Sequence, residues 1–244
     1  MRGFSIIVFI VVCHTAIAQP LQPLSPAAID SLITEMQKSY AKVNGYTCTF
    51  YKQERVDEEM RPRETILLKF RKPFQIYMRW VEGPYKGREL LYKDRWNDGE
   101  VRVKQESFPY LTVNIAPDGA LAMRGNRHPV TEAGIGQTVD IIVRDYQRGL
   151  SNPADSVRYY PREQETIYGA TVYCIEAVMP QDANAGYYAH RAVICISQRT
   201  RLPIHVKIWN ADNKLVEDYG YADLKINPGL TPRDFAPDNP AYGF

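Results

Sequence analysis

The spacing of apolar residues constrains the fold most, because apolar and polar residues alternate through much of the chain. This period of two is typical of β-strands with one buried face, since successive side chains point to opposite sides of a sheet. The strand-like runs fall into two blocks. The first block consists of residues 46–55, 64–71, 74–81, 88–93 and 100–104. The second block consists of residues 157–166, 171–179, 189–197, 203–209 and 215–226.

Short turn-forming stretches connect the runs of the first block. They include Lys72-Pro73 and the segments 82–84 and 97–99, which are rich in Gly, Pro, Asn and Asp. Connections this short join neighbouring strands that run in opposite directions. The first block is therefore predicted to be an antiparallel meander.

Helical spacing is found before and between the two strand blocks. Ser25-Pro26 is typical of a helix start, and apolar residues then recur every three or four positions over residues 26–43. The same spacing predicts helices over residues 115–123 and 137–150. The order of elements predicts an α+β, mainly β fold, in which a curved antiparallel sheet forms a half-open barrel with helices packed on its concave side.

The two ends of the chain are interpreted differently from its middle. Residues 1–18 have a basic start, a short apolar run and the small-residue site Ala16-Ile17-Ala18, which is the pattern of a secretory signal peptide cleaved after Ala18. A lipid-attachment site at Cys13 is disfavoured because Val12 precedes it. We expect residues 19–244 to form a single domain exported to the periplasm, with no transmembrane span and an irregular tail over residues 227–244.

The charge and the cysteines limit the possible partners and cross-links. A formal net charge of +2 gives no electrostatic reason to expect nucleic acid or an anionic membrane as the main partner. After cleavage three cysteines remain, namely Cys48, Cys174 and Cys195. If residues 171–179 and 189–197 form a hairpin, Cys174 and Cys195 are nearly opposite each other. They then form either a disulfide or two buried thiols.

One part of the sequence resembles a known family. The run GYTCTFYKQER, followed by ETILLKFRKPFQIYMRW and EGPYKGRELLYKDRWNDG, resembles exported bacterial proteins of unknown function, and the resemblance covers residues 35–226. In architecture this family is similar to the LolA/LolB/RseB-like lipoprotein-carrier superfamily. The shared steps are Lys72-Pro73-Phe74, Arg79-Trp80 and Leu202-Pro203-Ile204. The resemblance implies a LolA-like half-barrel whose apolar concave face holds acyl chains or another hydrophobic group.

The inward positions of the first strand block are the candidate cavity lining. They share an apolar side chain on the face that the alternation predicts to be buried. These residues are Phe50, Leu68, Phe70, Ile76, Met78, Trp80, Leu90 and Tyr92. Lys69, Gln75 and Arg79 fall on the opposite face, which is predicted to be wetted. Three further aromatic residues, Tyr85, Trp96 and Tyr110, are candidates for the edge of a ligand mouth.

The sequence contains no recognisable catalytic or metal-binding motif. It has no zinc-type His or Cys spacing, no nucleophile elbow, no Walker loop and no dinucleotide fingerprint. No cofactor or metal is therefore predicted. The leading hypothesis is a non-enzymatic binding protein whose partner is a hydrophobic ligand, such as a lipid, an acyl chain or a lipidated protein. The alternatives are an RseB-like protein-interaction or envelope-stress sensing module with a packed core and an envelope protein partner, and a hydrolase.

Overall fold

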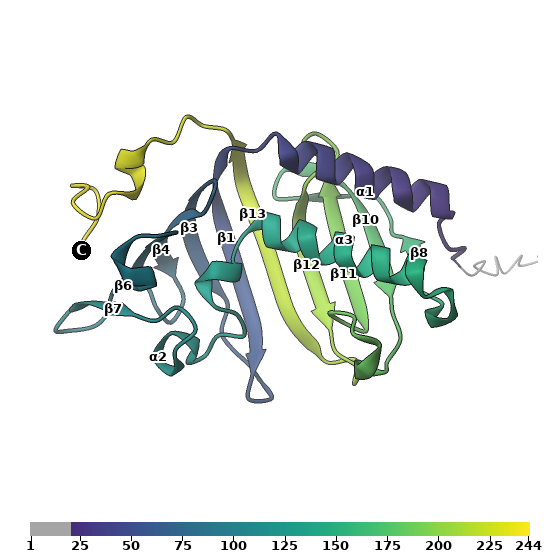
Figure 1. Cartoon of the computed structure of the whole chain (residues 1–244), viewed down its shortest axis with the longest axis horizontal. Helices are drawn as coiled ribbons and strands as arrows, with labels where there is room; N and C mark the ends of the chain where they lie inside the picture. Colours follow the sequence, from purple (N-terminus) through teal and green to yellow (C-terminus); the bar gives the residue numbers. More distant parts are fainter. Residues whose placement is uncertain (1–20) are drawn as a thin grey trace, which may run out of the picture.

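The structure, a computed structural model, describes residues 21–244, so the predicted signal peptide and its cleavage after Ala18 lie outside the described residues. The described chain forms one 13-stranded sheet with the order β7-β6-β5-β4-β3-β1-β13-β12-β11-β10-β8, while β2 pairs with β1 and β9 with β10. Helices lie across one face of this sheet (Figure 1). The path ends at β7 and β8 without joining them, so the sheet is an open half-barrel.

The elements have the following bounds. The first strands are β1 (Gly45–Val56), β2 (Glu59–Met60), β3 (Glu64–Arg71), β4 (Gln75–Glu82), β5 (Glu89–Lys93), β6 (Val101–Lys104) and β7 (Thr112–Ile115). The later strands are β8 (Arg158–Pro161), β9 (Glu165–Ile167), β10 (Ala170–Val178), β11 (Arg191–Ser197), β12 (Pro203–Trp209) and β13 (Leu215–Ile226). The α-helices are α1 (Pro26–Ala41), α2 (Ala120–Met123) and α3 (Ile135–Ser151). Short 3-10 turns occur at Asn97–Gly99, Val130–Glu132, Pro153–Asp155, Ala183–Ala185 and Pro232–Phe235.

The two strand blocks meet in the middle of the sheet, where β1 pairs antiparallel with β13. Phe50 is opposite Tyr221 in this register, and their rings stack with centroids 5.0 Å apart. Aromatic cross-strand pairs of this kind stabilise a sheet beyond the area they bury. The pairing of the first and last long strands therefore makes one continuous surface from two meanders.

Helix α1 begins where the sequence predicts. The Ser25 hydroxyl accepts a hydrogen bond from the amide of Ala28 at 3.3 Å, and Pro26 occupies the first turn. This capping arrangement satisfies one of the amides that a helix start leaves unpaired. The buried face of α1 presents Ile29, Ile33 and Met36 to the core.

Helix α3 crosses the concave face and is fixed at both ends. The Tyr46 hydroxyl on β1 accepts a hydrogen bond from the amide of Ile135 at 3.1 Å. Gly134 precedes the helix with a φ of +108°, and a Cβ there would lie only 2.5 Å from the Tyr46 hydroxyl, so glycine is required on both counts. Near the other end, the Asp145 carboxylate accepts from the amide of Tyr188 at 2.9 Å.

Two predicted elements were wrong in type or extent. Residues 112–115 form β7, which pairs with β6, and the helix predicted over residues 115–123 is limited to residues 120–123. The Pro117-Asp118-Gly119 turn separates the two elements. The strand predicted over residues 157–166 is divided into β8 and β9, which pair with different parts of β10.

The C-terminal segment, residues 227–244, is packed against the outer face of the sheet. Phe235 is fully buried with Tyr77 and Leu91, and Tyr242 stacks on Tyr77 with ring centroids 3.8 Å apart. Lys69 forms an ion pair with Asp234 at 2.9 Å. The outer face was predicted to be wetted, but this segment covers the part of it on β4 and β5.

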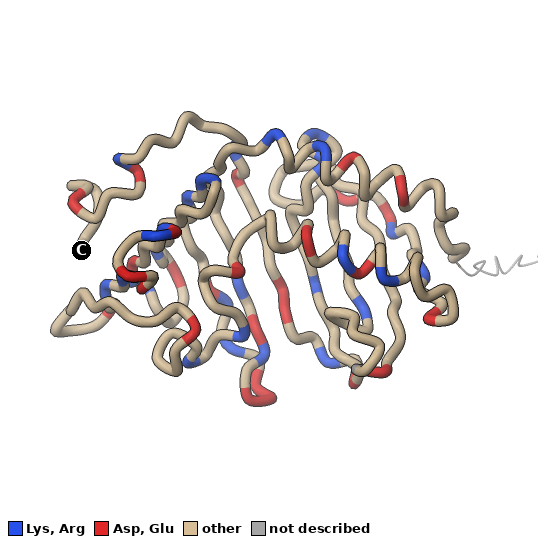
Figure 2. Tube along the Cα trace, viewed as in Figure 1, with Lys and Arg blue, Asp and Glu red and all other residues tan. Residues whose placement is uncertain are grey.

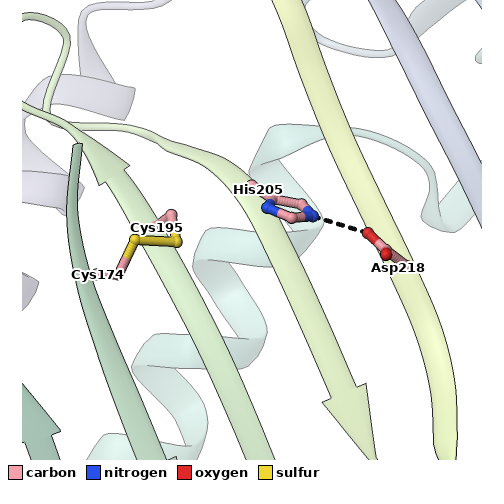
Figure 3. Close-up of a disulfide and its surroundings, with 4 residues drawn as sticks. All are labelled: Cys174, Cys195, His205 and Asp218. Atoms are coloured by element: carbon pink, nitrogen blue, oxygen red, sulfur yellow. Dashed lines mark hydrogen bonds and ion pairs between the residues drawn. A yellow bond between two sulfur atoms is a disulfide. The ribbon is translucent and has the colours of Figure 1, made fainter. Parts of the chain in front are cut away.

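The disulfide lies between two neighbouring strands. Cys174 and Cys195 are opposite each other in the β10–β11 register and are bonded to each other. Figure 3 shows this bridge beside the pair of His205 and Asp218, in which the imidazole Nε2 and a carboxylate oxygen are 2.7 Å apart. The bridge packs with Val172 and Ile204 in a small cluster separate from the main core. Cys48 is buried and unbonded.

Candidate functional site

A cavity of about 360 Å³ lies between the concave face of the sheet, α3 and the segment that precedes α3. Its volume falls within the range of roughly 300–1,000 Å³ that is typical of small-molecule sites. The segment that covers it, residues 124–134, is called the cover segment below. The apolar lining includes Phe50, Ile66, Met78, Trp80, Leu90, Val103, Val113, Leu121, Val130, Ile142, Ala177, Met179, Ala192, Ile194, Val206, Ile208 and Tyr221.

The structure separates the predicted lining residues into two groups. Phe50, Met78, Trp80 and Leu90 line the cavity. The other predicted residues share the same concave face but lie outside the cavity wall. They are the buried core residues Leu68, Phe70 and Ile76 and the partly buried Tyr92.

Aromatic packing fills the part of the concave face that the cavity does not reach. Tyr46 stacks on Phe70 with ring centroids 5.1 Å apart, and Phe70 meets Phe74 edge-to-face at 5.4 Å. Phe74 in turn meets Tyr92 at 5.8 Å. The cavity is therefore confined to the other end of the strands, where a polar cluster forms part of its wall.

Glu217 is the centre of that polar cluster. Its carboxylate accepts a hydrogen bond from Arg127 Nε at 2.9 Å and from the Tyr188 hydroxyl at 2.9 Å, and lies 3.1 Å from His128 Nε2. The Glu217 residue is 1% exposed. Two of these contacts come from the cover segment, so Glu217 on β13 holds that segment against the sheet.

A second buried carboxylate, Glu54 on β1, holds the same segment. It accepts from the backbone amide of Arg127 at 2.9 Å and from the Tyr219 hydroxyl, and its partner Lys52 is 3.2 Å away. Lys52 also donates to Asn126 at 2.6 Å. The cover segment is thus joined to both central strands, β1 and β13.

Glu64 on β3 completes the cluster. Lys52 Nζ donates to its carboxylate at 3.4 Å, and Trp80 Nε1 donates to it at 2.5 Å. Three buried carboxylates, Glu54, Glu64 and Glu217, therefore meet three basic side chains, Lys52, Arg127 and His128. Their charges balance when His128 is protonated, and pairing of this kind offsets the cost of burying charge.

The pKa values of the central pair are shifted in the directions expected for an ion pair. Burial lowers the pKa of His128, but its hydrogen bond to Glu217 and the charges of Glu217 and Glu54 outweigh this and raise the pKa above its usual value. Burial raises the pKa of Glu217, but hydrogen bonds from His128 and Arg127 outweigh it and leave the pKa lowered. Both shifts favour the charged forms in the folded protein.

Sequence reasoning missed this cluster although a signal was present. Lys52 and Glu54 continue the alternation begun by Phe50, so they occupy inward positions of β1. Glu217, Tyr219 and Tyr221 do the same on β13, and all five residues line the cavity. Charged residues in phase with an apolar stripe are the sign of a buried polar network. Their partners in the cover segment carry no periodic signal.

The cluster residues are engaged with one another, and burial raises the pKa of the Cys48 thiol well above its usual range. Within residues 21–244 there is no group of three or more metal-ligating side chains. In the same part of the chain no helix is both long and apolar enough to span a membrane.

The open sheet, the helices over its concave face and the apolar cavity beneath them define a half-barrel of the LolA-like class. The chain belongs to the family described as protein of unknown function (DUF1571), whose model matches residues 43–244. A comparison with curated protein sequences finds no match.

Solved structures share the fold at low sequence identity. The lipoprotein LppX of Mycobacterium tuberculosis is 13% identical with a TM-score of 0.52, and the match covers 85% of this chain and 99% of that one. The MucA/MucB complex of Pseudomonas aeruginosa is 11% identical with a TM-score of 0.47, and the match covers 86% of this chain and 60% of that one. A LolA superfamily protein of Nitrosomonas europaea is 12% identical with a TM-score of 0.36, and the match covers 86% of this chain and 97% of that one.

Proposed function

We propose that this protein is a non-enzymatic, exported binding protein that holds one hydrophobic ligand, such as an acyl chain, in the half-barrel. The apolar cavity under α3 carries the proposal, because buried apolar surface favours an apolar occupant over water. The fold shared with the lipoprotein LppX is compatible with it. We also propose that residues 19–244 act as a single domain, since one sheet includes both strand blocks.

The cavity volume supports a ligand with a single chain. At about 360 Å³ the cavity lies near the lower end of the range for small-molecule sites, roughly 300–1,000 Å³. A lipid with several chains would leave part of its apolar surface outside. The polar cluster at one end, with its buried charges already paired, offers hydrogen-bonding surface to a polar end group but no unpaired charge.

The test is binding of a fluorescent acyl probe to the purified protein and to a cavity-filling variant. Ala192 on β11 lines the cavity, and Ala192→Phe would occupy part of its volume. We expect the affinity for the probe to fall by about tenfold or more. The matched control is Val193→Phe, because Val193 is the next residue of β11 and packs on the other face of the sheet.

Organic extraction followed by mass spectrometry checks for a ligand carried through purification. Equal probe affinity in Ala192→Phe and the wild type would contradict binding in the cavity, provided that circular dichroism shows the same fold for both. No extracted ligand, no probe binding and a stable protein partner in a pull-down would instead favour the RseB-like interaction module.

A further inference from the structure

The hairpin between β6 and β7 presents large apolar side chains to solvent. Phe108 is 84% exposed, Tyr110 57% and Leu111 52%. Of the seven large hydrophobic residues that are exposed in the described part of the chain, these three and Leu121 of α2 are close in sequence. Grouped apolar exposure of this kind marks a contact surface more often than isolated exposure does.

The tip of this hairpin is folded. The amide of Gln105 donates to the carbonyl of Leu111 at 2.9 Å, and the amide of Tyr110 donates to the carbonyl of Ser107 at 2.7 Å. The rings of Phe108 and Tyr110 meet edge-to-face with centroids 6.3 Å apart. The apolar side chains are therefore presented by an ordered turn, so ordering them costs little entropy on binding.

The charged residues next to the tip are paired away from it. Lys104 forms an ion pair with Glu89 at 3.4 Å, and Glu106 forms one with Arg88 at 2.9 Å. Residues 107–111, which lie between Glu106 and β7, include no charged residue. Figure 2 shows the end of the loop between β6 and β7 without charged residues. An uncharged aromatic tip can enter an apolar medium without desolvating an ion.

The strands that carry the tip form part of the cavity wall. Val103, Gln105 and Val113 of the same hairpin line the cavity, and so does Leu121 of α2. Leu121 is also 58% exposed, so the cavity reaches the surface beside α2. Figure 1 shows α2 and the hairpin at the same corner of the molecule. The same hairpin therefore forms part of the cavity wall and presents the exposed apolar tip.

We propose that the hairpin tip docks this corner onto a lipid bilayer by inserting Phe108, Tyr110 and Leu111 into the interfacial region. Phe and Leu suit the acyl boundary, and Tyr, with an apolar ring and a polar hydroxyl, suits the headgroup level. The near-neutral net charge does not oppose this docking, because the tip acts through apolar contact.

Two exposed basic residues at the same corner match phosphate headgroups. Lys86 is in the β4–β5 turn, and the neighbouring Gly87 approaches the backbone of Glu106 at the hairpin, since a Cβ built there is 3.9 Å from its carbonyl oxygen. Arg124 directly follows α2, is exposed and lines the cavity. A lipid surface satisfies both the apolar tip and these cations.

The test is flotation of the protein with vesicles of phosphatidylcholine and phosphatidylglycerol. We expect the wild type to float and Phe108→Ser/Leu111→Ser to lose about tenfold or more of its vesicle partitioning. Phe108→Trp should retain partitioning, because Trp favours the interface. The matched control is Leu150→Ser, since Leu150 is as exposed as Leu121, at 58%. It belongs to the last turn of α3, whose end lies near β8 and away from this corner in Figure 1.

Probe binding in buffer without vesicles separates docking from the proposed function. The double serine variant should bind the acyl probe as the wild type does, because neither side chain lines the cavity. If the wild type fails to float, or if the double variant floats equally well, the proposal is overturned. If salt abolishes flotation and the double serine variant floats as the wild type does, flotation depends on the basic residues alone. That result also overturns the proposal.

Discussion

The imidazole of His128 contacts two carboxylates from different parts of the chain. Its Nε2 lies 3.1 Å from Glu217 on β13, and its Nδ1 lies 3.2 Å from Glu132 within the cover segment. Tyr188, Glu54 and Arg127 complete its polar surroundings. His128 is therefore the member of the polar cluster whose usual pKa lies closest to neutral pH, and its contacts with Glu217 and Glu54 raise that pKa.

The raised pKa of His128 gives a prediction with a definite sign. The stabilisation from the protonated ring is complete below the unfolded-state pKa, about 6.5, and is lost as pH rises through the higher folded-state pKa. We expect the difference in unfolding free energy between the wild type and His128→Gln to shrink as the pH rises above about 6.5. Urea unfolding at each pH measures it.

A histidine outside the cluster provides the control for this experiment. His190 Nδ1 lies 2.7 Å from the backbone carbonyl of Met179, so His190→Gln removes an imidazole without removing a carboxylate partner. A stability difference that stays constant or grows with pH in His128→Gln would show that the ring does not act as the cation of the cluster. On the acid side, the lowered pKa of Glu217 means that its contribution is lost only as pH falls through that lowered value.

Among the elements, the C-terminal segment is irregular, as the sequence predicts, but its packing against the sheet was not predicted. Its Pro, Asp and Asn content indicates irregular structure, and within residues 227–244 only Pro232–Phe235 forms a regular turn. Its position on the outer face depends on single side chains, mainly Phe235 and Tyr242 against Tyr77. Single anchoring side chains do not recur at a regular spacing, so the sequence pattern does not reveal that this segment packs against the sheet.

Phe235→Ala tests whether that anchor stabilises the segment. Phe235 is fully buried, and truncating a buried Phe typically costs about 3–5 kcal/mol. We expect a loss near the lower value, with faster proteolysis after residue 227, because the segment can separate from β4 and β5 while the main core stays intact. Thermal unfolding and limited proteolysis measure the two effects.

Phe244→Ala is the matched control, because Phe244 is only partly buried at the edge of the same cluster. It should change both readouts less than Phe235→Ala does. Equal proteolysis rates for Phe235→Ala and the wild type would mean that other contacts, such as the ion pair of Lys69 with Asp234, hold the segment in place.

Strand and helix patterns are predictable from this sequence where the period continues over many residues. The runs 64–71, 203–209 and 215–226 coincide with β3, β12 and β13, and the predicted helix over 137–150 lies within α3. The predictions of short elements were wrong because local turns determine where such elements begin and end. The Pro117-Asp118-Gly119 turn ends β7 and delays α2, and residues 162–164 divide β8 from β9.

The site was less predictable than the fold. The period of two identifies the concave face, but it does not show where along the strands side chains leave a space. Phe70 and Tyr92 fill their end of the face through contacts with Tyr46 and Phe74, whereas Met78 and Leu90 face the cavity. That difference depends on how α3 and the cover segment approach the sheet, which is a tertiary effect.

At the scale of the whole molecule, the sheet and the cover segment form one connected unit. The β1–β13 pair joins the two meanders, and the polar cluster joins the cover segment to the same two strands through Glu54 and Glu217. A ligand in the cavity contacts the sheet, α3 and the cover segment at once. The free energy of ligand binding should therefore add to the free energy of global unfolding and not only stabilise the cover segment locally.

This connection predicts how an acyl ligand changes stability. A ligand that binds only the folded state adds RT ln(1 + [L]/Kd), which is about 2.7 kcal/mol at a free concentration about 100 times Kd. We expect that increase in the unfolding free energy of the wild type and of Val193→Phe. Ala192→Phe should gain far less at the same ligand concentration, because part of its cavity is filled. If the ligand stabilised both variants equally, it would be bound outside the cavity, since Ala192 lines the cavity and Val193 does not.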